Sequence, residues 1–159
     1  MLYTMDNEPK KGYEMELELG FSGYHTHQMD DKGRIRIPPI FRRKLGDHPI
    51  IFCNSFEKCL WIYTDVEFKK KIIDRFDGSD VLNKKMNIIQ RAIFSSTQEL
   101  VEDKQGRVSL NSAFIETCGF EKDLISIGVD DHVEVWSEAA YKEYLAKTDL
   151  DDILSQIIL

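Results

Sequence analysis

Hydrophobic and polar positions along the chain form short β-prone runs that are separated by turns. Residues 34–37 alternate charged and apolar side chains, which favours a strand with one buried face. Residues 21–29 form a longer run that ends at a turn containing Gly33. Two apolar runs, 49–55 and 59–63, are separated by three polar or aromatic residues and predict a hairpin. The first half of the chain is therefore expected to contribute four short strands.

Helix signals interrupt and follow these strands. Pro38 and Pro39 suit the first turn of a short helix, and Gly46 suits its C-terminal end. Thr64, followed three residues later by Glu67, predicts the capped start of a longer helix. A further helix is expected between the two halves of the chain.

The same order of elements recurs at one constant offset. The matched positions are Asp30 with Asp103, Gly33 with Gly106, Arg34 with Arg107 and Phe41 with Phe114. The second set of strands is predicted at 95–102, 107–110, 124–129 and 132–136, with Ser137 as the cap of the last helix. Because one offset holds through turn, apolar and cap positions without a gap, we interpret the chain as two copies of one unit.

This repeat predicts the organisation of the chain. The two units are 21–78 and 92–148, joined by a helical linker at 79–91. Residues 1–20 are expected to be a disordered acidic extension, and 149–159 an amphipathic tail that serves either as a subunit contact or as the occupant of an intramolecular groove. Each unit is too small to bury its own sheet. We therefore expect an α+β fold in which both units interleave into one pseudo-symmetric, barrel-like β body with peripheral helices.

Composition narrows the class of protein. The chain has 159 residues, of which 42% are hydrophobic, so most of it should fold around a core. It has no apolar run of the roughly 18 residues that a membrane span needs and no signal-peptide pattern, so no membrane partner is expected. Three unclustered cysteines indicate reduced thiols in the cytoplasm. Of these, Cys53 and Cys59 are expected to be buried and to lie near each other across the hairpin.

The net charge of -7 by itself argues against a nucleic-acid partner, but the charge is unevenly distributed along the chain. Residues 30–44 carry six basic side chains and two acidic ones, whereas residues 92–137 carry three basic and nine acidic side chains. The two terminal segments are also acidic. The basic character is thus confined to the first turn and its short helix, and the acidic remainder would limit indiscriminate DNA binding.

The duplicated Asp-x-x-Gly-Arg turn is the most distinctive chemical feature. Asp30 and Asp103 can hold the arginine four residues later, across a turn that needs Gly33 or Gly106. An arginine held in this way offers a two-pronged donor face suited to phosphate or to the O6/N7 edge of guanine. The alternative is an internal salt bridge that only ties the hairpin together. Duplication of the turn favours the binding role.

Other classes of protein have weaker support. The pair His25 and His27, with Asp30 and Asp31 nearby, would suit a metal-dependent hydrolase, but the repeat carries Gln98 and Leu100 at the histidine positions and no third ligand has suitable spacing. We therefore expect no enzyme activity, metal, cofactor or small-molecule substrate. An AbrB-like antitoxin with a partner-masking tail remains an alternative. Trp61 and Trp136 are expected to pack in the core or at a subunit contact.

The chain resembles the MraZ family over about residues 21–145. The resemblance is carried by GYH at 23–25, MDDKGRIRIP at 29–38, FR at 41–42, CLWIY at 59–63, Arg91, DKQGRV at 103–108, GV at 128–129 and EVWS at 134–137. It implies two AbrB-like, swapped-hairpin barrel units in one chain that assembles into a ring-like homo-oligomer. It also implies a cytoplasmic, nucleoid-associated transcriptional regulator, acting as a repressor on short direct repeats in the promoter of the division and cell-wall gene cluster.

The family's DNA-reading element is the Asp-x-x-x-Arg turn, which corresponds here to Arg34 and Arg107. The flanking basic residues are expected to contact phosphates: Lys32, Arg36, Arg42 and Lys104. The sequence departs from the family's pattern in its acidic extension at 1–20, in Asn111 where proline is usual, and in Ser109, which stands where the first unit has Arg36. The second turn is therefore expected to contribute less to DNA binding.

Overall fold

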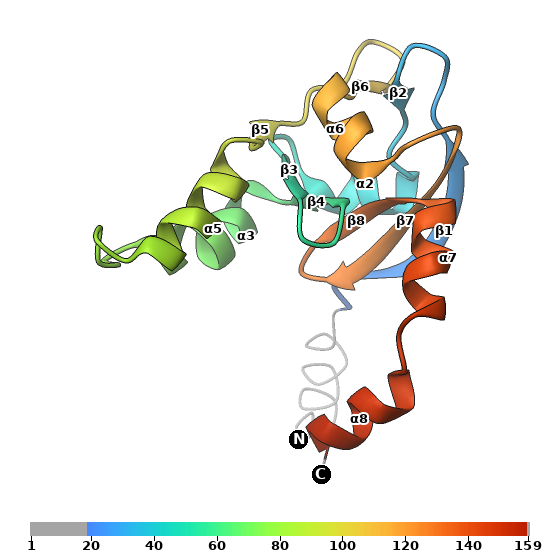
Figure 1. Cartoon of the computed structure of the whole chain (residues 1–159). Coiled ribbons are helices and arrows are strands. Elements are labelled where there is room, and N and C mark those ends of the chain that lie inside the picture. Colours follow the sequence, from blue (N-terminus) through green and yellow to red (C-terminus); the bar gives the residue numbers. More distant parts are fainter. Residues whose placement is uncertain (1–18, 159) are drawn as a thin grey trace, which may run out of the picture.

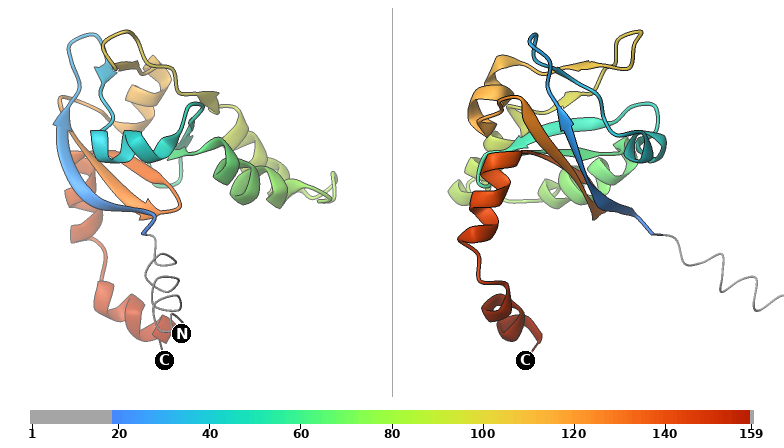
Figure 2. Two further views of the ribbon diagram at one scale, coloured as in Figure 1. Left: turned by 180° about the vertical axis from the view of Figure 1, so that it is seen from behind. Right: turned by 90° about the vertical axis from the view of Figure 1, so that its right-hand side faces the viewer.

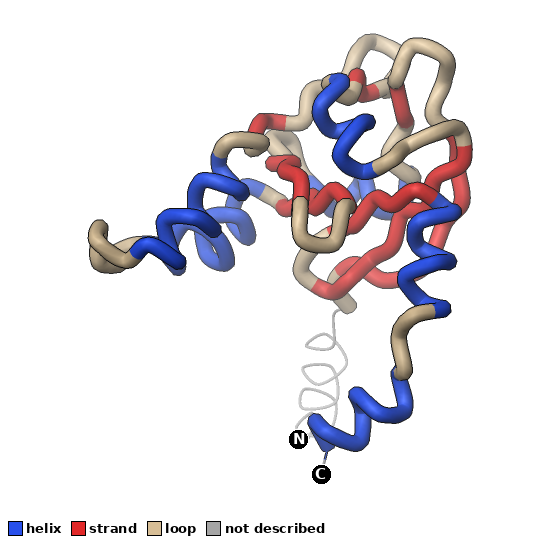
Figure 3. The backbone as a smooth tube through the Cα atoms, in the orientation of Figure 1, coloured by secondary structure: helices blue, strands red, loops and turns tan. Residues whose placement is uncertain are grey.

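The computed structural model describes residues 19–158 (Figure 1). The acidic extension predicted at 1–20 lies almost wholly outside these described residues. Within them, a sheet and a small two-stranded ribbon form the body, and helices lie around it (Figure 3).

The main sheet is six-stranded and antiparallel, in the order β1-β7-β8-β4-β3-β5. The strands are β1 (Phe21–Gln28), β3 (Ile50–Asn54), β4 (Cys59–Tyr63), β5 (Gln98–Glu99), β7 (Asp123–Asp130) and β8 (Val133–Ser137). A second sheet pairs β2 (Arg34–Ile35) with β6 (Val108–Ser109). Both predicted hairpins, β3–β4 and β7–β8, are confirmed.

Strands are exchanged between the two halves of the chain. The first strand of the first half, β1, pairs with β7 of the second half, and β5 of the second half pairs with β3 of the first. The small sheet likewise joins one strand from each half. The sheet is pseudo-symmetric: if each strand is replaced by its counterpart in the other half (β1 by β5, β3 by β7, β4 by β8), the same order is obtained, read from the opposite edge.

One buried cluster unites the halves. It includes Ile35 and Phe41 from the first half and Val108 and Phe114 from the second, each at most 3% exposed. Because every exchanged strand contributes to this cluster or to its sheet, neither half could bury its apolar face alone.

Helices surround the sheets at nearly the predicted places. They are α2 (Pro39–Leu45), α3 (Asp65–Phe68), a π-helical segment η1 (Lys69–Ile73), α4 (Asp74–Phe76), α5 (Lys84–Phe94), α6 (Ser112–Cys118), α7 (Glu138–Ala146) and α8 (Leu150–Ile158). The caps are confirmed: Thr64 Oγ1 accepts from the Glu67 amide at 3.0 Å, and Ser137 Oγ accepts from the Ala140 amide at 3.3 Å. Trp136 is 3% exposed and lies against Tyr141 and Tyr144 of α7, as expected for a core side chain.

The predicted strand at 95–102 is wrong over most of its length. The linker helix begins later than expected, with Asn83 as its cap, and it runs to Phe94. The Thr97 amide still donates to the Phe94 carbonyl at 3.3 Å, so the chain cannot enter the sheet before Gln98. As a result β5 has two residues where β1 has eight.

The C-terminal tail forms a helix, as its spacing predicts. Residues 150–158 are all exposed, and α8 projects from the body below α7 (Figures 1 and 2). No helix in the described part of the chain has the length and apolar character that crossing a bilayer requires.

Candidate nucleic-acid interface

The first Asp-x-x-Gly-Arg turn is a closed loop of hydrogen bonds. The Asp30 amide donates to the Arg34 carbonyl at 2.9 Å, and the Gly33 amide donates to the Asp30 carbonyl at 3.0 Å. Gly33 has φ of 75°, a left-handed conformation that glycine adopts without the steric penalty of a Cβ. This geometry brings the side chain of Asp30 back over the turn.

The Asp30 carboxylate then fixes both the turn and its arginine. Oδ1 accepts from the amides of Lys32 and Arg34, each at 2.9 Å, and Oδ2 accepts from Arg34 Nε at 2.7 Å. These bonds, above all the one from the Arg34 amide, lower the pKa of Asp30 because they favour its charged form. The carboxylate therefore stays ionised and holds the arginine in one orientation.

The second turn repeats this geometry. Asp103 Oδ1 accepts from the amides of Gln105 and Arg107 at 2.8 and 2.9 Å, and Oδ2 accepts from Arg107 Nε at 2.8 Å. Gly106 has φ of 78°, and the pKa of Asp103 is lowered, chiefly by the amide of Arg107. Residues in both copies of the motif therefore adopt the same conformation.

The two turns lie side by side at one end of the molecule. Pairing of β2 with β6 sets Arg34 opposite Ser109, and the Leu110 amide donates to the Gly33 carbonyl at 3.0 Å. Arg36 crosses from the first half and donates through Nη1 to the Gln105 carbonyl in the second turn. Both turns form the upper edge of the body in Figure 1. Two clamped arginines are thus presented on one surface.

Each clamped arginine keeps donors for a ligand. The bond to aspartate uses Nε, and within the described residues the Nη groups of Arg34 and Arg107 donate no hydrogen bond. Both side chains are 25% exposed. Fixed Nη groups at a partly exposed site can donate in pairs to a phosphate or to a guanine edge.

The flanking basic residues differ in how far they are engaged. Lys32 and Lys104 are exposed beside the turns. Arg42, in contrast, donates through Nε to Glu102 at 2.7 Å and through Nη1 to the Gly46 carbonyl at 2.7 Å. Arg36 is occupied by the Gln105 carbonyl. Arg36 and Arg42 therefore join the two halves, a role that sequence reasoning missed because their partners lie far away in the sequence.

The histidine pair does not form a metal site. His27 Nε2 lies 2.6 Å from Ser126 Oγ, and burial together with His25 lowers the pKa of His27 to about 4. The ring of His25 instead packs edge-on against Phe41 at 5.1 Å. Within residues 19–158, no cluster of three or more His, Cys, Asp or Glu side chains could hold a metal ion.

The cysteines are buried as predicted, but their expected arrangement is wrong. Cys53 Sγ lies 3.7 Å from Cys118 Sγ, whereas across the hairpin Cys53 is paired with Leu60 and Cys59 with Asn54. Successive residues of a strand alternate faces, which separates Cys53 from Cys59. The close partner comes from α6 of the other half.

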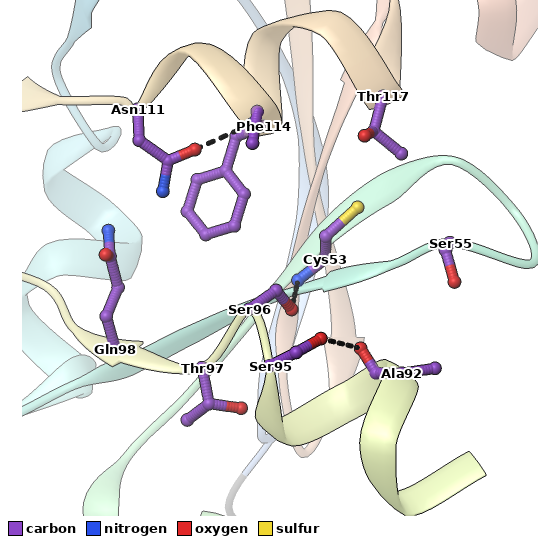
Figure 4. A pocket seen from close by; sticks show the side chains of 11 residues that line it. Cys53, Ser55, Ala92, Ser95, Ser96, Thr97, Gln98, Asn111, Phe114 and Thr117 are labelled. Carbon is purple, nitrogen blue, oxygen red and sulfur yellow. Dashed lines mark hydrogen bonds between the residues drawn. The ribbon is translucent and has the colours of Figure 1, made fainter. Parts of the chain in front are cut away.

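A cavity of about 390 Å³ opens beside Cys53, where the shortened β5 leaves the edge of β3 uncovered (Figure 4). The Cys53 amide donates to Ser96 Oγ at 3.0 Å in place of a strand partner. Asn111 caps α6 above this cavity by accepting from the Phe114 amide at 2.7 Å. The cavity lining is made of hydroxyl, amide, apolar and thiol side chains and carries no charged group, which sets it apart from the turn surface.

Fold and surface together define an α+β protein with exchanged strands and a duplicated arginine turn. Residues 21–90 and 93–155 match the family model described as "MraZ protein, putative antitoxin-like". The chain therefore belongs to the MraZ family, as its motifs indicated.

Several curated relatives cover most of the chain. A protein of Salinispora arenicola named transcriptional regulator MraZ is 33% identical over 131 residues, covering 82% of this chain and 91% of the relative. Proteins of the same name from Clostridium acetobutylicum and Dictyoglomus thermophilum are 36% identical over 124 residues and 32% identical over 139 residues. These cover 78% and 86% of this chain, and 86% and 92% of the respective relatives.

Proposed function

We propose that this chain is a sequence-specific DNA-binding transcriptional regulator that contacts DNA through its two Asp-x-x-x-Arg turns. The observation that carries this proposal is the pair of clamped arginines, Arg34 and Arg107, on one surface. The names of its relatives support a role in transcription.

The arginines are proposed to read bases and the lysines to contact phosphates. A rigid guanidinium suits the bidentate acceptors of guanine in the major groove. Lys32 and Lys104 are flexible point charges and suit the phosphate backbone. Arg36 and Arg42 are assigned weaker phosphate contacts, because intramolecular acceptors already engage their guanidinium groups. Asp30 and Asp103 orient the reading arginines without touching DNA.

The finer role follows from the MraZ resemblance. We propose that the two halves are tandem AbrB-like, swapped-hairpin barrel units, and the strand exchange supports this. We further propose a ring-shaped homo-oligomer that represses the division and cell-wall gene cluster from the nucleoid. Repeats spaced by about 10 bp would present each site to the same face of DNA. Weak contacts from several turns would then add together.

The test is fluorescence anisotropy with duplex DNA from upstream of the protein's own gene, measured across a salt series. We expect tighter binding to this DNA than to a scrambled duplex, and an affinity that falls steeply with salt as phosphate contacts release counterions. Lys142→Ala, which removes an exposed positive charge on α7, should bind as the native chain does. Equal affinity for both duplexes, or no binding at low salt, would refute the proposal.

A further inference from the structure

Helix α8 presents an apolar face that nothing in the described structure covers. Leu150, Ile153, Leu154, Ile157 and Ile158 follow the spacing of one helix face and are between 41% and 76% exposed. Such a contiguous face in a small protein marks an interaction surface. The chain therefore carries a projecting apolar element.

An apolar groove lies elsewhere on the molecule, between the β3–β4 hairpin and the helices η1 and α5. Its volume is about 220 Å³, and its walls are almost entirely apolar. The side chains that form it include Phe52, Phe56, Trp61, Ile72, Ile89 and Ile93. Phe56 is 69% exposed and Ile89 37% exposed, so the groove is open to a partner.

Helix α8 and helix α5, which forms one wall of the groove, carry opposite charges. Asp151 and Asp152 lie in α8, which has no basic residue. Helix α5 contains three basic residues and no acidic one. Lys85 precedes Ile89 by one helical turn and so lies on the same side of α5 as the groove. The same sequence thus contains an acidic helix with an apolar face and an apolar groove that has a basic helix along one wall.

We propose that α8 of one copy docks in this groove of a neighbouring copy. The α3–α5 arm extends to one side of the body and α8 extends downward from below α7 (Figures 1 and 2), so helix and groove are separate parts of the surface, as the two parts of a head-to-tail contact are. Only Lys147 to Asp149 separate α8 from α7, so the start of α8 lies at most about 14 Å from the end of its own α7. A head-to-tail contact that closes makes a ring. This inference rests on the proposed homo-oligomer and identifies the contact that holds it.

The first test is the molar mass of each variant, measured by light scattering without DNA. Leu154→Asp/Ile157→Asp should reduce the assembly to the 18.5 kDa single chain, because two charges would enter the apolar contact. Ser155→Asp/Gln156→Asp adds the same charge to the polar face of α8 and should leave the mass unchanged. An unchanged mass for the Leu154/Ile157 variant would overturn the proposal.

The groove is tested in the same way. Ile89→Glu should also give single chains, whereas Ile88→Glu, one residue away and outside the groove lining, should assemble normally. Circular dichroism would establish that both variants are folded. Full assembly of the Ile89 variant would refute the assignment of the groove.

Mixing the two defective proteins distinguishes this contact from other arrangements. The Ile89→Glu chain keeps an intact α8 and the Leu154→Asp/Ile157→Asp chain keeps an intact groove, so an equimolar mixture should form a 1:1 dimer and nothing larger. Pairing of α8 with α8 would let the Ile89→Glu chain assemble by itself, and docking of α8 in its own groove would leave only single chains in the mixture. Arg34→Ala should keep the native mass while losing DNA binding, so failure of the interface and failure of the proposed function give different results.

Discussion

The two halves of the chain have the same turn in different surroundings. Asp30 and Asp103 make the same three hydrogen bonds, with distances that agree within 0.1 Å. Around them the halves diverge: Arg36 and Arg42 stand near the first turn and donate to Gln105 and Glu102 of the second half. The comparison shows that the shared Asp, Gly and Arg are accompanied by the same turn in both halves, although the surrounding charge differs.

The strands preceding the turns diverge further. In the β1–β7 pair, His27 lies opposite Leu124. The repeat matches His27 with Leu100 and Leu124 with Ile51, so Leu100 would be expected opposite Ile51 in the β5–β3 pair, but it does not lie there. Gln98 lies there instead, so the register has shifted by two residues. The shift goes together with the extension of α5 to Phe94, which delays entry of the chain into the sheet.

The largest effect should come from the core, where the halves are equivalent. Phe41→Ala and Phe114→Ala each remove a ring that is 1% exposed, and each should lower the free energy of unfolding by about 3–5 kcal/mol. Because the two rings belong to one cluster, both variants should unfold in a single transition. Urea denaturation at fixed protein concentration measures this.

The matched control is Ile88→Ala, whose side chain is 57% exposed and which should change stability by less than about 0.5 kcal/mol. Two separate transitions in either phenylalanine variant would contradict a shared core and support halves that fold independently.

The next effect separates the two turns. Arg34→Ala should abolish specific binding, since each bidentate base contact contributes about 1–3 kcal/mol and is repeated around an oligomer. Arg107→Ala should weaken binding less, because acidic residues surround the second turn. Anisotropy titrations of both variants against upstream DNA measure the difference. If Arg34→Ala bound as tightly as the native chain, the site would be wrongly assigned.

The sequence predicts the turns better than it predicts their neighbours. Asp, Gly and Arg at fixed spacing specify a local conformation, and the repeat of Asp30 at Asp103 identifies both turns without knowledge of the fold. The pairing of Arg42 with Glu102 depends instead on strand exchange between distant segments. Likewise the repeat of the first unit predicts a strand at 95–102, but local helix bonds that end at Thr97 prevail over it. A single sequence therefore predicts conformations that depend on neighbouring residues, but not the contacts between distant segments or the competition between helix and strand at one segment.

A smaller effect concerns the start of α6. Asn111 accepts from the Phe114 amide, whereas Pro38, its counterpart before α2, makes no side-chain cap bond. Asn111→Ala should therefore reduce stability by about 1 kcal/mol, and Asn111→Ser, which restores an acceptor, should recover most of it. Thermal unfolding measures both. Equal stability of the alanine and serine variants would show that the cap contributes nothing.

The last comparison is between a partly buried histidine, His27, and a buried one, His132, whose pKa values shift in opposite directions. Burial and His25 lower the pKa of His27 to about 4, so the neutral ring is the stable form. Burial also opposes the charge on His132, but hydrogen bonds to Glu134 at 2.9 Å and Asp131 at 2.7 Å outweigh it and raise the pKa. His132 also stacks on Trp61 at 4.0 Å. Its counterpart in the first hairpin is Cys59, a buried thiol whose raised pKa keeps it neutral.

Together, the contributions of these two histidines to stability are largest near pH 6.5, the ordinary pKa of histidine. The contribution of His27 is present above pH 6.5 and is lost as the pH falls toward about 4, because the unfolded chain binds the proton first. The contribution of His132 is complete below pH 6.5 and is lost as the pH rises through its raised pKa. Urea unfolding from pH 4.5 to 9 measures the free energy of unfolding as a function of pH. His27→Gln should reduce its fall at acid pH, and His132→Gln should reduce its fall at alkaline pH. His48 is exposed, and although Glu99 raises its pKa, His48→Gln should leave both falls nearly unchanged. If the free energy of unfolding of His132→Gln still fell at alkaline pH as in the native chain, another group would cause that fall, and the Asp131–His132–Glu134 contacts would have no role in the pH dependence.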